Sequence, residues 1–318
     1  MSDFDLKAAD KKYGKGVIQK GIGNLKGIES VPSGSFNIDR GSGIGGYPKG
    51  RYIEIFGPEH SGKTTLAIHA MAECQKAGGD VGFIDVEHAL AFPYAQALGV
   101  DTDELYIARP EYGEQAFEIA EDMIKLGKFD LIVLDSVAAL VPIAELEGSM
   151  TDQQMGLQAR MIGKGVRKLT AVMHKNETTF IFINQLRMKI GVVFGNPETR
   201  PGGKALDYAT SMMLEIRRGT AIKKGEDVLG YRTNVKFTKN KVGGMPGAKV
   251  EFDLMWGAGI NYNAEVFDEA VDLDIIDKSG AWYSYKDSRV GQGKQNSLQF
   301  LEENPEIFKE IRTKVMEA

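Results

Sequence analysis

From Arg51 onward, short apolar runs alternate with segments whose apolar residues recur at helical spacing. Short apolar runs bounded by turn residues are typical of buried strands, and longer periodic segments are typical of amphipathic helices. The pattern predicts, in order, strand 52–56, helix 64–77, strand 81–85, helix 114–126, strand 130–134, helix 155–174 and strand 178–183. Such alternation predicts a mainly parallel sheet with helices on both faces.

The pattern changes after Lys204. Longer stretches of alternating apolar and polar residues at 211–217, 233–239 and 248–254 predict strands that extend the same sheet in antiparallel fashion. Residues 261–318 return to mixed helix and turn, with a short strand at 281–285. We therefore expect an α/β core with a mixed, mainly parallel central sheet at 26–260 and a small α+β C-terminal domain at 261–318.

Residues 1–25 are too few and too polar to form a core of their own. A charged segment with helical character is followed by a glycine-rich stretch at 13–18. This composition is typical of an arm. Two interpretations stay open, an N-terminal polymerisation arm that docks on another subunit and a frayed terminus.

Composition narrows the class of protein. Of the 318 residues, 42% are hydrophobic and 26% are charged, which is ordinary for a soluble globular chain. No apolar run approaches the roughly 20 residues of a membrane span, and the N-terminus lacks the apolar segment of a secretory signal. The expected location is cytoplasmic, with no membrane partner. The single cysteine, Cys74, and four scattered histidines indicate neither a disulfide nor a zinc site.

The formal net charge of −5 argues against nucleic-acid binding by the whole surface. Residues 156–204, however, contain nine lysines and arginines against only Glu177 and Glu198. The alternative, that these cations belong to solvated helix faces, is favoured for Lys168 and Lys175. The strip as a whole indicates a localised basic channel.

A complete G-x-x-x-x-G-K-[ST] motif follows the first predicted strand and opens the first predicted helix. In that setting the backbone amides form an anion site, Lys63 reaches the β- and γ-phosphates, and the Thr64 hydroxyl coordinates magnesium. The sequence thus predicts binding of a nucleoside triphosphate. The residues assigned to this site are Gly57, Pro58, Glu59, His60, Ser61, Gly62, Lys63, Thr64 and Thr65.

Polar residues end three further predicted strands. Asp135 follows the apolar run 131–134 and is placed beside the loop to hold magnesium. Glu87 follows the strand at 81–85, where a carboxylate activates the attacking water; the alternative is that Glu87 or Asp85 caps a turn. Gln185 ends the strand at 178–183 and precedes a loop rich in glycine and cations, so it is either a sensor of the γ-phosphate or an ordinary strand-end residue.

Several stretches resemble the RecA family of bacterial DNA strand-exchange recombinases. The similarity runs from about Tyr13 to the C-terminus and is more specific than the phosphate loop alone. The matching stretches are GPEHSGKTT (57–65), FIDVEHAL (83–90), LIVLDSVAAL (131–140), MGLQARM (155–161), FINQLRMKIGVVFGNPET (182–199), KNK (239–241) and GAWYSYK (280–286).

The resemblance implies an ATPase that uses ATP and Mg²⁺, polymerises as a helical filament on single-stranded DNA and pairs that strand with homologous double-stranded DNA. Its partners would be both forms of DNA and further copies of the chain. By position, the resemblance assigns phosphate, magnesium, catalytic and sensor roles to Lys63, Thr64, Glu87, Asp135 and Gln185. Lys239 and Lys241 match lysines that reach across to the neighbour's ATP.

Two DNA loops are implied at 145–160 and 186–204. The positions that match residues near the DNA backbone are Met155, Arg160, Arg167, Gly202 and Gly203, and the local cations added to them are Lys164, Arg200 and Lys204. Arginines and glycine amides suit phosphate contacts that carry no sequence information. Binding is therefore expected to be sequence-independent and sensitive to salt.

The chain departs from the family pattern at four places. Ala91 stands where the family has an aspartate, so Tyr94 stacks on adenine without an acidic contact to the base edge. Asp207-Tyr208 stands where Lys-Phe is expected at the subunit interface, and Arg200-Pro201 replaces small hydroxyl residues, which stiffens the loop. The chain also ends at Ala318 without an acidic tail, so weaker restraint on duplex binding is expected.

Basic residues in the C-terminal domain form a candidate patch for duplex capture, with ordinary surface cations as the alternative. They are Lys278, Lys286, Arg289 and Lys294. The leading hypothesis for the whole chain is an ATP-dependent DNA recombinase. A RecA-fold regulator or loader with little hydrolysis and a hexameric DNA helicase are the alternatives.

Overall fold

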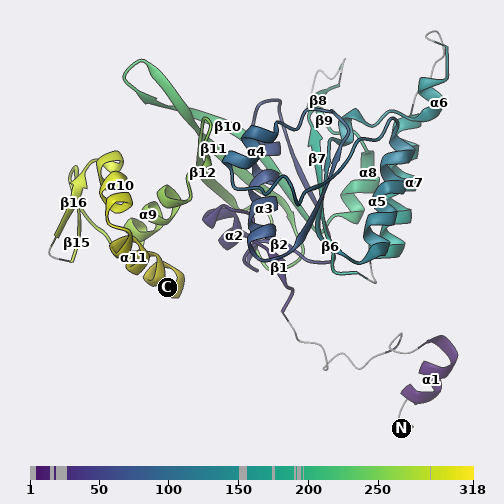
Figure 1. Ribbon diagram of the computed structural model, residues 1–318, viewed down its shortest axis with the longest axis horizontal. Coiled ribbons are helices and arrows are strands. Elements are labelled where there is room, and N and C mark those ends of the chain that lie inside the picture. Colours follow the sequence, from purple (N-terminus) through teal and green to yellow (C-terminus); the bar gives the residue numbers. More distant parts are fainter. Residues whose placement is uncertain are drawn as a thin grey trace.

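The computed structural model describes residues 5–14, 18, 27–149, 156–173, 176–189, 191, 195, 197–286 and 288–318. Its centre is a nine-stranded sheet (Figure 1). The strands are β3 (Tyr52–Gly57), β4 (Asp80–Asp85), β5 (Tyr106–Ala108), β6 (Phe129–Asp135), β7 (Thr179–Gln185), β10 (Met212–Lys224), β11 (Asp227–Asn240), β12 (Lys249–Met255) and β13 (Gly259–Ile260). Their order across the sheet is β13-β12-β11-β10-β3-β7-β6-β4-β5.

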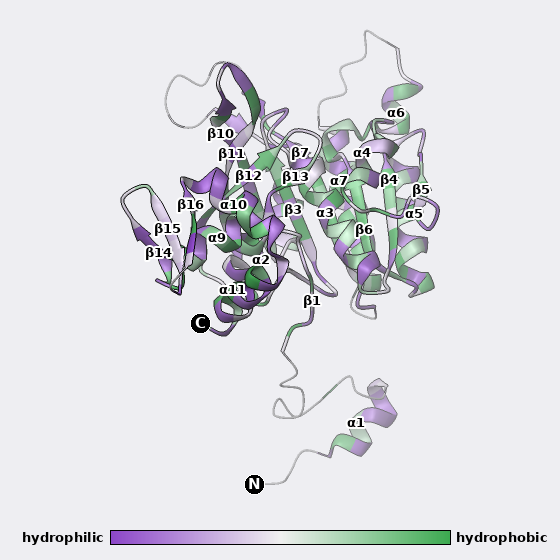
Figure 2. Ribbon diagram, turned by 60° about the vertical axis from the view of Figure 1, so that its left-hand side comes forward, coloured by the Kyte–Doolittle hydropathy of each residue, from purple (hydrophilic) through white to green (hydrophobic). Residues whose placement is uncertain are grey.

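Six neighbouring strands, from β10 to β5, run parallel, and β11, β12 and β13 continue the sheet in antiparallel fashion. Strands β3, β4, β6 and β7, in the middle of the parallel part, are buried on both faces, which is why they read as nearly continuous apolar runs (Figure 2). The predicted mixed, mainly parallel sheet is confirmed.

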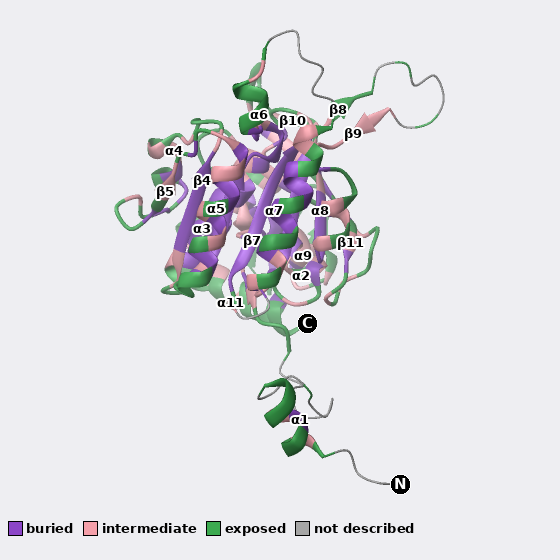
Figure 3. Cartoon of the chain, turned by 90° about the vertical axis from the view of Figure 1, so that its right-hand side faces the viewer, coloured by how far each residue is buried: buried purple, intermediate pink, exposed green. Residues whose placement is uncertain are grey.

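Side chains that alternate along each strand form two cores, one on each face of the sheet. Leu131 and Val133 of β6 pack with helix α3 (Lys63–Lys76), whereas Ile132 and Leu134 pack with α5 (Gly113–Leu126) and α7 (Leu157–Met173). Figure 3 shows the buried strands between helices whose outer faces are exposed. The carboxyl ends of the parallel strands therefore meet at one edge of the sheet.

Some elements differ from the predicted pattern. Helix α4 (Phe92–Ala97) and strand β5 were not predicted, because both are short and β5 is an edge strand with little burial. The hairpin of β10 and β11 continues beyond the predicted end near Arg217, through residues that are mostly exposed and carry no alternating apolar signal.

The remaining helices and strands of the core are short and lie in its connections. They are β1 (Ser30–Val31), α2 (Phe36–Ser42), β2 (Tyr47–Pro48), η1 (Val137–Ala139), α6 (Ile143–Leu146), β8 (Arg187–Met188), β9 (Glu198–Thr199) and α8 (Gly203–Ala209). Strand β1 pairs with β2, and β8 pairs with β9.

The C-terminal part has a hydrophobic core of its own, built around Phe267, Ile276 and Ile311. Its elements are α9 (Tyr262–Asp272), β14 (Asp277–Ser279), β15 (Trp282–Tyr285), β16 (Ser288–Gln292), α10 (Lys294–Glu303) and α11 (Pro305–Glu317). The three strands form an antiparallel sheet. The expected small α+β domain is present, and Phe36 of α2 packs into its core.

At the N-terminus, helix α1 (Leu6–Tyr13) begins at Asp5, whose side chain accepts hydrogen bonds from the amides of Lys7 and Ala8. Figure 1 places α1 away from the central sheet. Most of the rest of segment 1–25 lies outside the described residues. Among the helices that are described, none combines the length and apolar character needed to cross a membrane.

Candidate nucleotide and DNA sites

The phosphate loop joins buried strand β3 to helix α3. A Cβ on Gly57 would lie 2.1 Å from the carbonyl oxygen of Ile216, and Gly62, at the start of α3, has φ of 94°. Both positions therefore require glycine. No side chain caps α3, so its first amides are free to bind an anion. The Pro58 carbonyl accepts hydrogen bonds from Lys63 Nζ at 2.7 Å and from Ser61 Oγ at 2.8 Å.

The predicted acidic and amide residues meet beside this loop. Thr64 Oγ1 donates to Asp135 Oδ2 at 2.7 Å, which joins the loop to the end of β6. Gln185 Nε2, at the end of β7, donates to Glu87 Oε1 at 3.0 Å. Ser136, to which the sequence analysis assigned no role, also donates its hydroxyl to Glu87. The phosphate loop and these strand ends surround a cavity of ≈ 400 Å³. It is lined by Glu59, His60, Gly62, Lys63, Thr64, Thr65, Glu87, Asp135 and Gln185.

Burial governs the charges of this cavity. It raises the pKa of Asp135 to about 6, and it lowers the pKa of Lys63, against the opposing pull of Asp135 and Glu87. A buried ammonium group beside free helix amides fits a phosphate chain, and the Thr64 hydroxyl and Asp135 carboxylate are oxygen ligands that suit magnesium. The described residues contain no cluster of three metal-ligating side chains. Phosphate oxygens of the nucleotide or water molecules would complete the coordination of a magnesium ion held by Thr64 and Asp135.

A second cavity of ≈ 420 Å³ shares His60, Gly62 and Thr65 with the first. Tyr94 lines it and its hydroxyl lies 3.2 Å from Thr65 Oγ1. The sequence analysis did not identify two further lining residues, Arg218 and Trp256. The guanidinium of Arg218 lies 3.5 Å from the ring centre of Tyr231 and 5.3 Å from that of Trp256. An exposed tryptophan before a glycine turn was the available signal.

Lys239 and Lys241 line neither of these two cavities of their own chain. Lys239 lies on β11 and donates from Nζ to the backbone carbonyl of Asp207. Burial and the nearby positive charge of Lys241 lower the pKa of Lys239. Across the sheet, Lys239 lies opposite Met213, which lies opposite Glu54.

The residues assigned to DNA lie on α7, on α8 and before α8, except Met155, which falls outside the described residues. Arg160, Lys164 and Arg167 are exposed on α7, and Lys204 is exposed on α8. Gly202 precedes α8, and Gly203 is its first residue. Helices α7 and α8 are neighbours, since a Cβ on Gly163 would lie 3.7 Å from that of Ala205.

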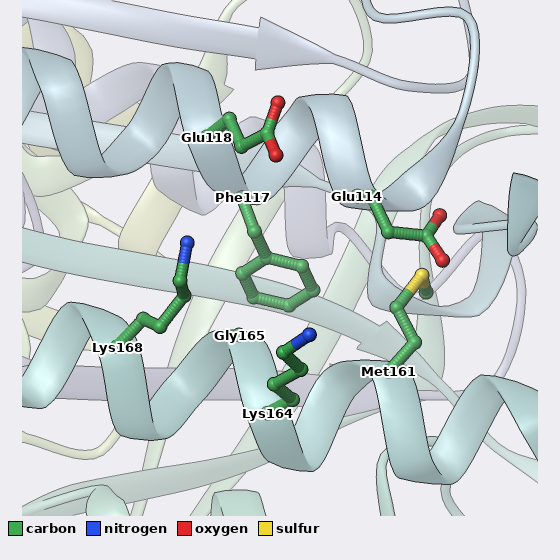
Figure 4. A pocket seen from close by; sticks show the side chains of 7 residues that line it. All are labelled: Glu114, Phe117, Glu118, Met161, Lys164, Gly165 and Lys168. Atoms are coloured by element: carbon green, nitrogen blue, oxygen red, sulfur yellow. The ribbon is translucent and has the colours of Figure 1, made fainter.

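Two of the assigned cations occupy surroundings that the sequence did not predict. Lys164 lines a pocket between α5 and α7 whose rim carries Glu114 and Glu118 (Figure 4). Arg200 forms ion pairs with Glu54 and Asp207. The two ion pairs of Arg200 reduce the charge that it can offer to DNA phosphates.

A phosphate loop between a buried strand and a helix, with acids and an amide at the ends of adjacent parallel strands, defines a phosphate-loop nucleotide-binding protein. The family model described as the RecA N-terminal domain matches residues 2–261, and that of the RecA C-terminal domain matches residues 264–318. The chain belongs to the RecA family.

Curated relatives agree over nearly the whole chain. Protein RecA of Desulforapulum autotrophicum is 54% identical over 310 residues, which cover 97% of this chain and 89% of the relative. Protein RecA of Staphylococcus epidermidis is 53% identical over 317 residues, covering 99% and 90%. Protein RecA of Campylobacter jejuni is 54% identical over 311 residues, covering 97% and 90%.

RecA-family proteins are DNA-dependent ATPases that act in homologous recombination and DNA repair, and this chain is a recombinase of that family. The similarity includes the C-terminal domain, which the hexameric helicase hypothesis does not explain.

Proposed function

We propose that the chain forms a helical filament on single-stranded DNA, with ATP and Mg²⁺ bound between protomers, and pairs that strand with a homologous duplex. The observation that carries this proposal is the contact between Glu87 and Gln185 beside the phosphate loop. It joins the candidate catalytic carboxylate to the strand that leads into the second proposed DNA loop. Binding of nucleotide and binding of DNA would then both affect the carboxyl end of β7.

Each residue of the first cavity has a chemical role in the proposal. Lys63 and the first amides of α3 bind the phosphates, while Thr64 and Asp135 hold magnesium, which balances phosphate charge when bound. Glu87 accepts a proton from the attacking water. The γ-phosphate competes with Glu87 for the Gln185 amide, so binding of the triphosphate frees the carboxylate and moves the end of β7. Tyr94 supports the base in the second cavity.

For the DNA strand, we assign phosphate contacts to Arg160, Arg167 and Lys204, with the backbone amides of Gly202 and Gly203. Their exposure and the proximity of α7 to α8 support this assignment. Lys164 is a further exposed cation on α7, whereas Arg200 contributes less charge because it pairs with Glu54 and Asp207. Lys239 and Lys241 complete the ATP site of the adjacent protomer, segment 1–25 supports polymerisation, and the C-terminal domain at 261–318 captures duplex DNA.

Measuring ATP hydrolysis with and without single-stranded DNA tests the proposal. The chain should hydrolyse ATP slowly alone, and single-stranded DNA should raise the rate by at least tenfold, the size of a typical allosteric coupling. Lys63→Ala should lower the DNA-stimulated rate by about 10³-fold, because no other cation in the loop replaces Nζ at the phosphates. Equal rates with and without DNA would refute the coupling of DNA to the site.

A further inference from the structure

Glu54 is a buried carboxylate that the nucleotide chemistry does not use. It lies on β3, three residues before the phosphate loop, and only 1% of it is exposed. Asn184 Nδ2 on β7 donates to its Oε1 at 2.8 Å, and the guanidinium of Arg200 pairs with its Oε2. Burial raises the pKa of Glu54, and the charge of Arg200 opposes this rise. A buried carboxylate requires such a partner, so Arg200 is held at β3.

The other terminal nitrogen atom and the face of the Arg200 guanidinium also contact groups within the protein. Its Nη2 lies 2.6 Å from Asp207 Oδ1 on α8, and its guanidinium lies 4.2 Å from the ring centre of Phe56. Only 21% of its side chain is exposed. An arginine with two carboxylate partners and an aromatic ring beneath it is poorly placed to neutralise a DNA phosphate.

A continuous set of hydrogen bonds joins this arginine to the nucleotide cavity. The Asn184 side chain donates to Glu54, donates to the Pro201 carbonyl at 3.0 Å, and accepts from the amide of Gln185 at 2.9 Å. Gln185 in turn donates to Glu87. The end of β7 is therefore bonded both to the candidate catalytic carboxylate and to the last part of the second proposed DNA loop.

Two departures from the family pattern meet at this point. Arg200 replaces a small hydroxyl residue, Asp207 replaces a lysine, and the two side chains are paired. The cation of this pair lies on the loop and not on the helix, and it is also the cation that pairs with Glu54. The Asp207 carbonyl also accepts a hydrogen bond from Lys239. Together the two substitutions lower the summed charge of positions 200 and 207 by one, so the compensation between them lies in the cation offered to Glu54 and not in net charge.

We propose that Arg200 is a positioning residue that fixes the end of the second DNA loop to the β3–β7 edge, and so transmits the nucleotide state from Gln185 to DNA affinity. It acts through Glu54, Asn184 and Asp207 and makes no DNA contact itself. This inference rests on the proposed function, since it assigns the coupling between the two proposed sites to a particular side chain.

Binding of a fluorescent single-stranded oligonucleotide tests the inference, measured over a range of salt with a non-hydrolysable ATP analogue and with ADP. For Arg200→Gln we expect the ratio of the two affinities to fall by about tenfold, while the salt slope is unchanged. Lys204→Gln is the matched loss of a nearby cation. It should lower the slope by about 0.7 and leave the nucleotide ratio unchanged. A slope lowered by Arg200→Gln, with an unchanged ratio, would overturn the inference in favour of a DNA contact.

Arg200→Gln leaves Glu54 without its cation and could prevent folding. The double variant Arg200→Thr with Asp207→Lys restores a cation on α8, so it should recover folding and most of the nucleotide ratio, whereas Arg200→Thr alone should not. Failure of the double variant to exceed the single variant would refute the compensation. If the unmodified chain shows no ATP-dependent DNA binding, the proposed function itself fails. If the unmodified chain binds DNA in an ATP-dependent way and Arg200→Gln has the same nucleotide ratio, the inference about Arg200 is wrong and the proposed function stands.

Discussion

At the scale of residues, hydrogen bonds to the side chain of Glu265 join the C-terminal domain to the core. Its carboxylate, 2% exposed, accepts hydrogen bonds from Ser35 Oγ at 2.6 Å and from the amides of Phe36 and Asn37 at 3.2 Å. It lies on α9, and these donors form the beginning of α2. Burial raises the pKa of Glu265 to about 8 despite the three donors, and nearby Asp39 adds repulsion. The folded chain therefore keeps this carboxyl protonated at pH values at which the unfolded chain has lost the proton.

Replacing Glu265 by glutamine should flatten the dependence of stability on pH. The unfolded carboxyl ionises near 4.5, whereas the folded one ionises near 8. Its stabilising contribution is thus complete below pH 4.5 and is lost as the pH rises through 8. Between pH 5 and 8, Glu265→Gln should gain about 3 to 4 kcal/mol in the free energy of unfolding relative to the unmodified chain. Urea unfolding at several pH values measures this gain, and parallel curves for both chains would contradict the shifted pKa.

The residues that the structure brings together in the candidate nucleotide site could be predicted, because a local motif or a strand end specifies each of them. Lys63 and Thr64 follow from the loop, and Asp135 follows from an apolar run that ends in an acid. Glu54 and the pairing of Arg200 could not be predicted in this way. Their contact joins β3 to a loop far along the chain, and only the strand order β10-β3-β7 brings the two together. A charge count assigned Arg200 to DNA because it cannot detect an internal partner.

At the scale of elements, the cations of the candidate duplex patch differ in whether they form ion pairs within the protein. Lys294, at the start of α10, lies 2.7 Å from Asp268 of α9 and 3.3 Å from Asp253 of β12. Arg232 of β11 pairs with both of the same acids. This cluster connects four elements, β11, β12, α9 and α10, across the boundary between the core and the C-terminal domain. Arg289 on β16, by contrast, is exposed beside the ring of Trp282.

Substitutions of these two cations should have different effects. Arg289→Gln should weaken duplex binding about threefold and lower the salt slope by about 0.9, because it removes one phosphate contact. Lys294→Gln should leave the slope unchanged and lower the free energy of unfolding by about 0.5 kcal/mol, since Arg232 still pairs with the acids. Duplex titrations in salt and urea unfolding separate the two effects. If the slope fell equally in both variants, Lys294 would belong to the DNA patch.

Elements with a strong periodic signal were also the ones that could be predicted. Strands β3, β6 and β7 are buried on both faces, and the helical pattern of α5 and α7 is long enough to identify. The tip of the β10–β11 hairpin gave no such signal, because it extends into solvent and is held by pairing between strands and not by burial. Pairing partners cannot be identified from the hydropathy of one strand.

At the scale of the whole molecule, the nucleotide site is open on the side where hydrolysis would occur. Glu59, His60 and Glu87 are exposed, although Lys63 and Asp135 beneath them are buried. Low water access strengthens the electrostatic interactions that stabilise a transition state. A second protomer that covers this face, with Lys239 and Lys241 directed at the phosphates, would supply both exclusion of water and positive charge. Head-to-tail contacts of this kind generate helical filaments.

Mixing two inactive variants tests this shared site. Lys63→Ala protomers have a defective loop but keep Lys239, and Lys239→Ala protomers have the opposite defect. In an equal mixture, about a quarter of head-to-tail interfaces combine an intact loop with an intact Lys239, so DNA-stimulated ATP hydrolysis should rise toward a quarter of the unmodified rate. Lys236→Ala, an exposed lysine on the same strand, is the control and should retain full activity alone. A mixture no more active than the sum of its components would mean that Lys239 serves its own chain, because only a contribution from the neighbouring protomer can restore turnover.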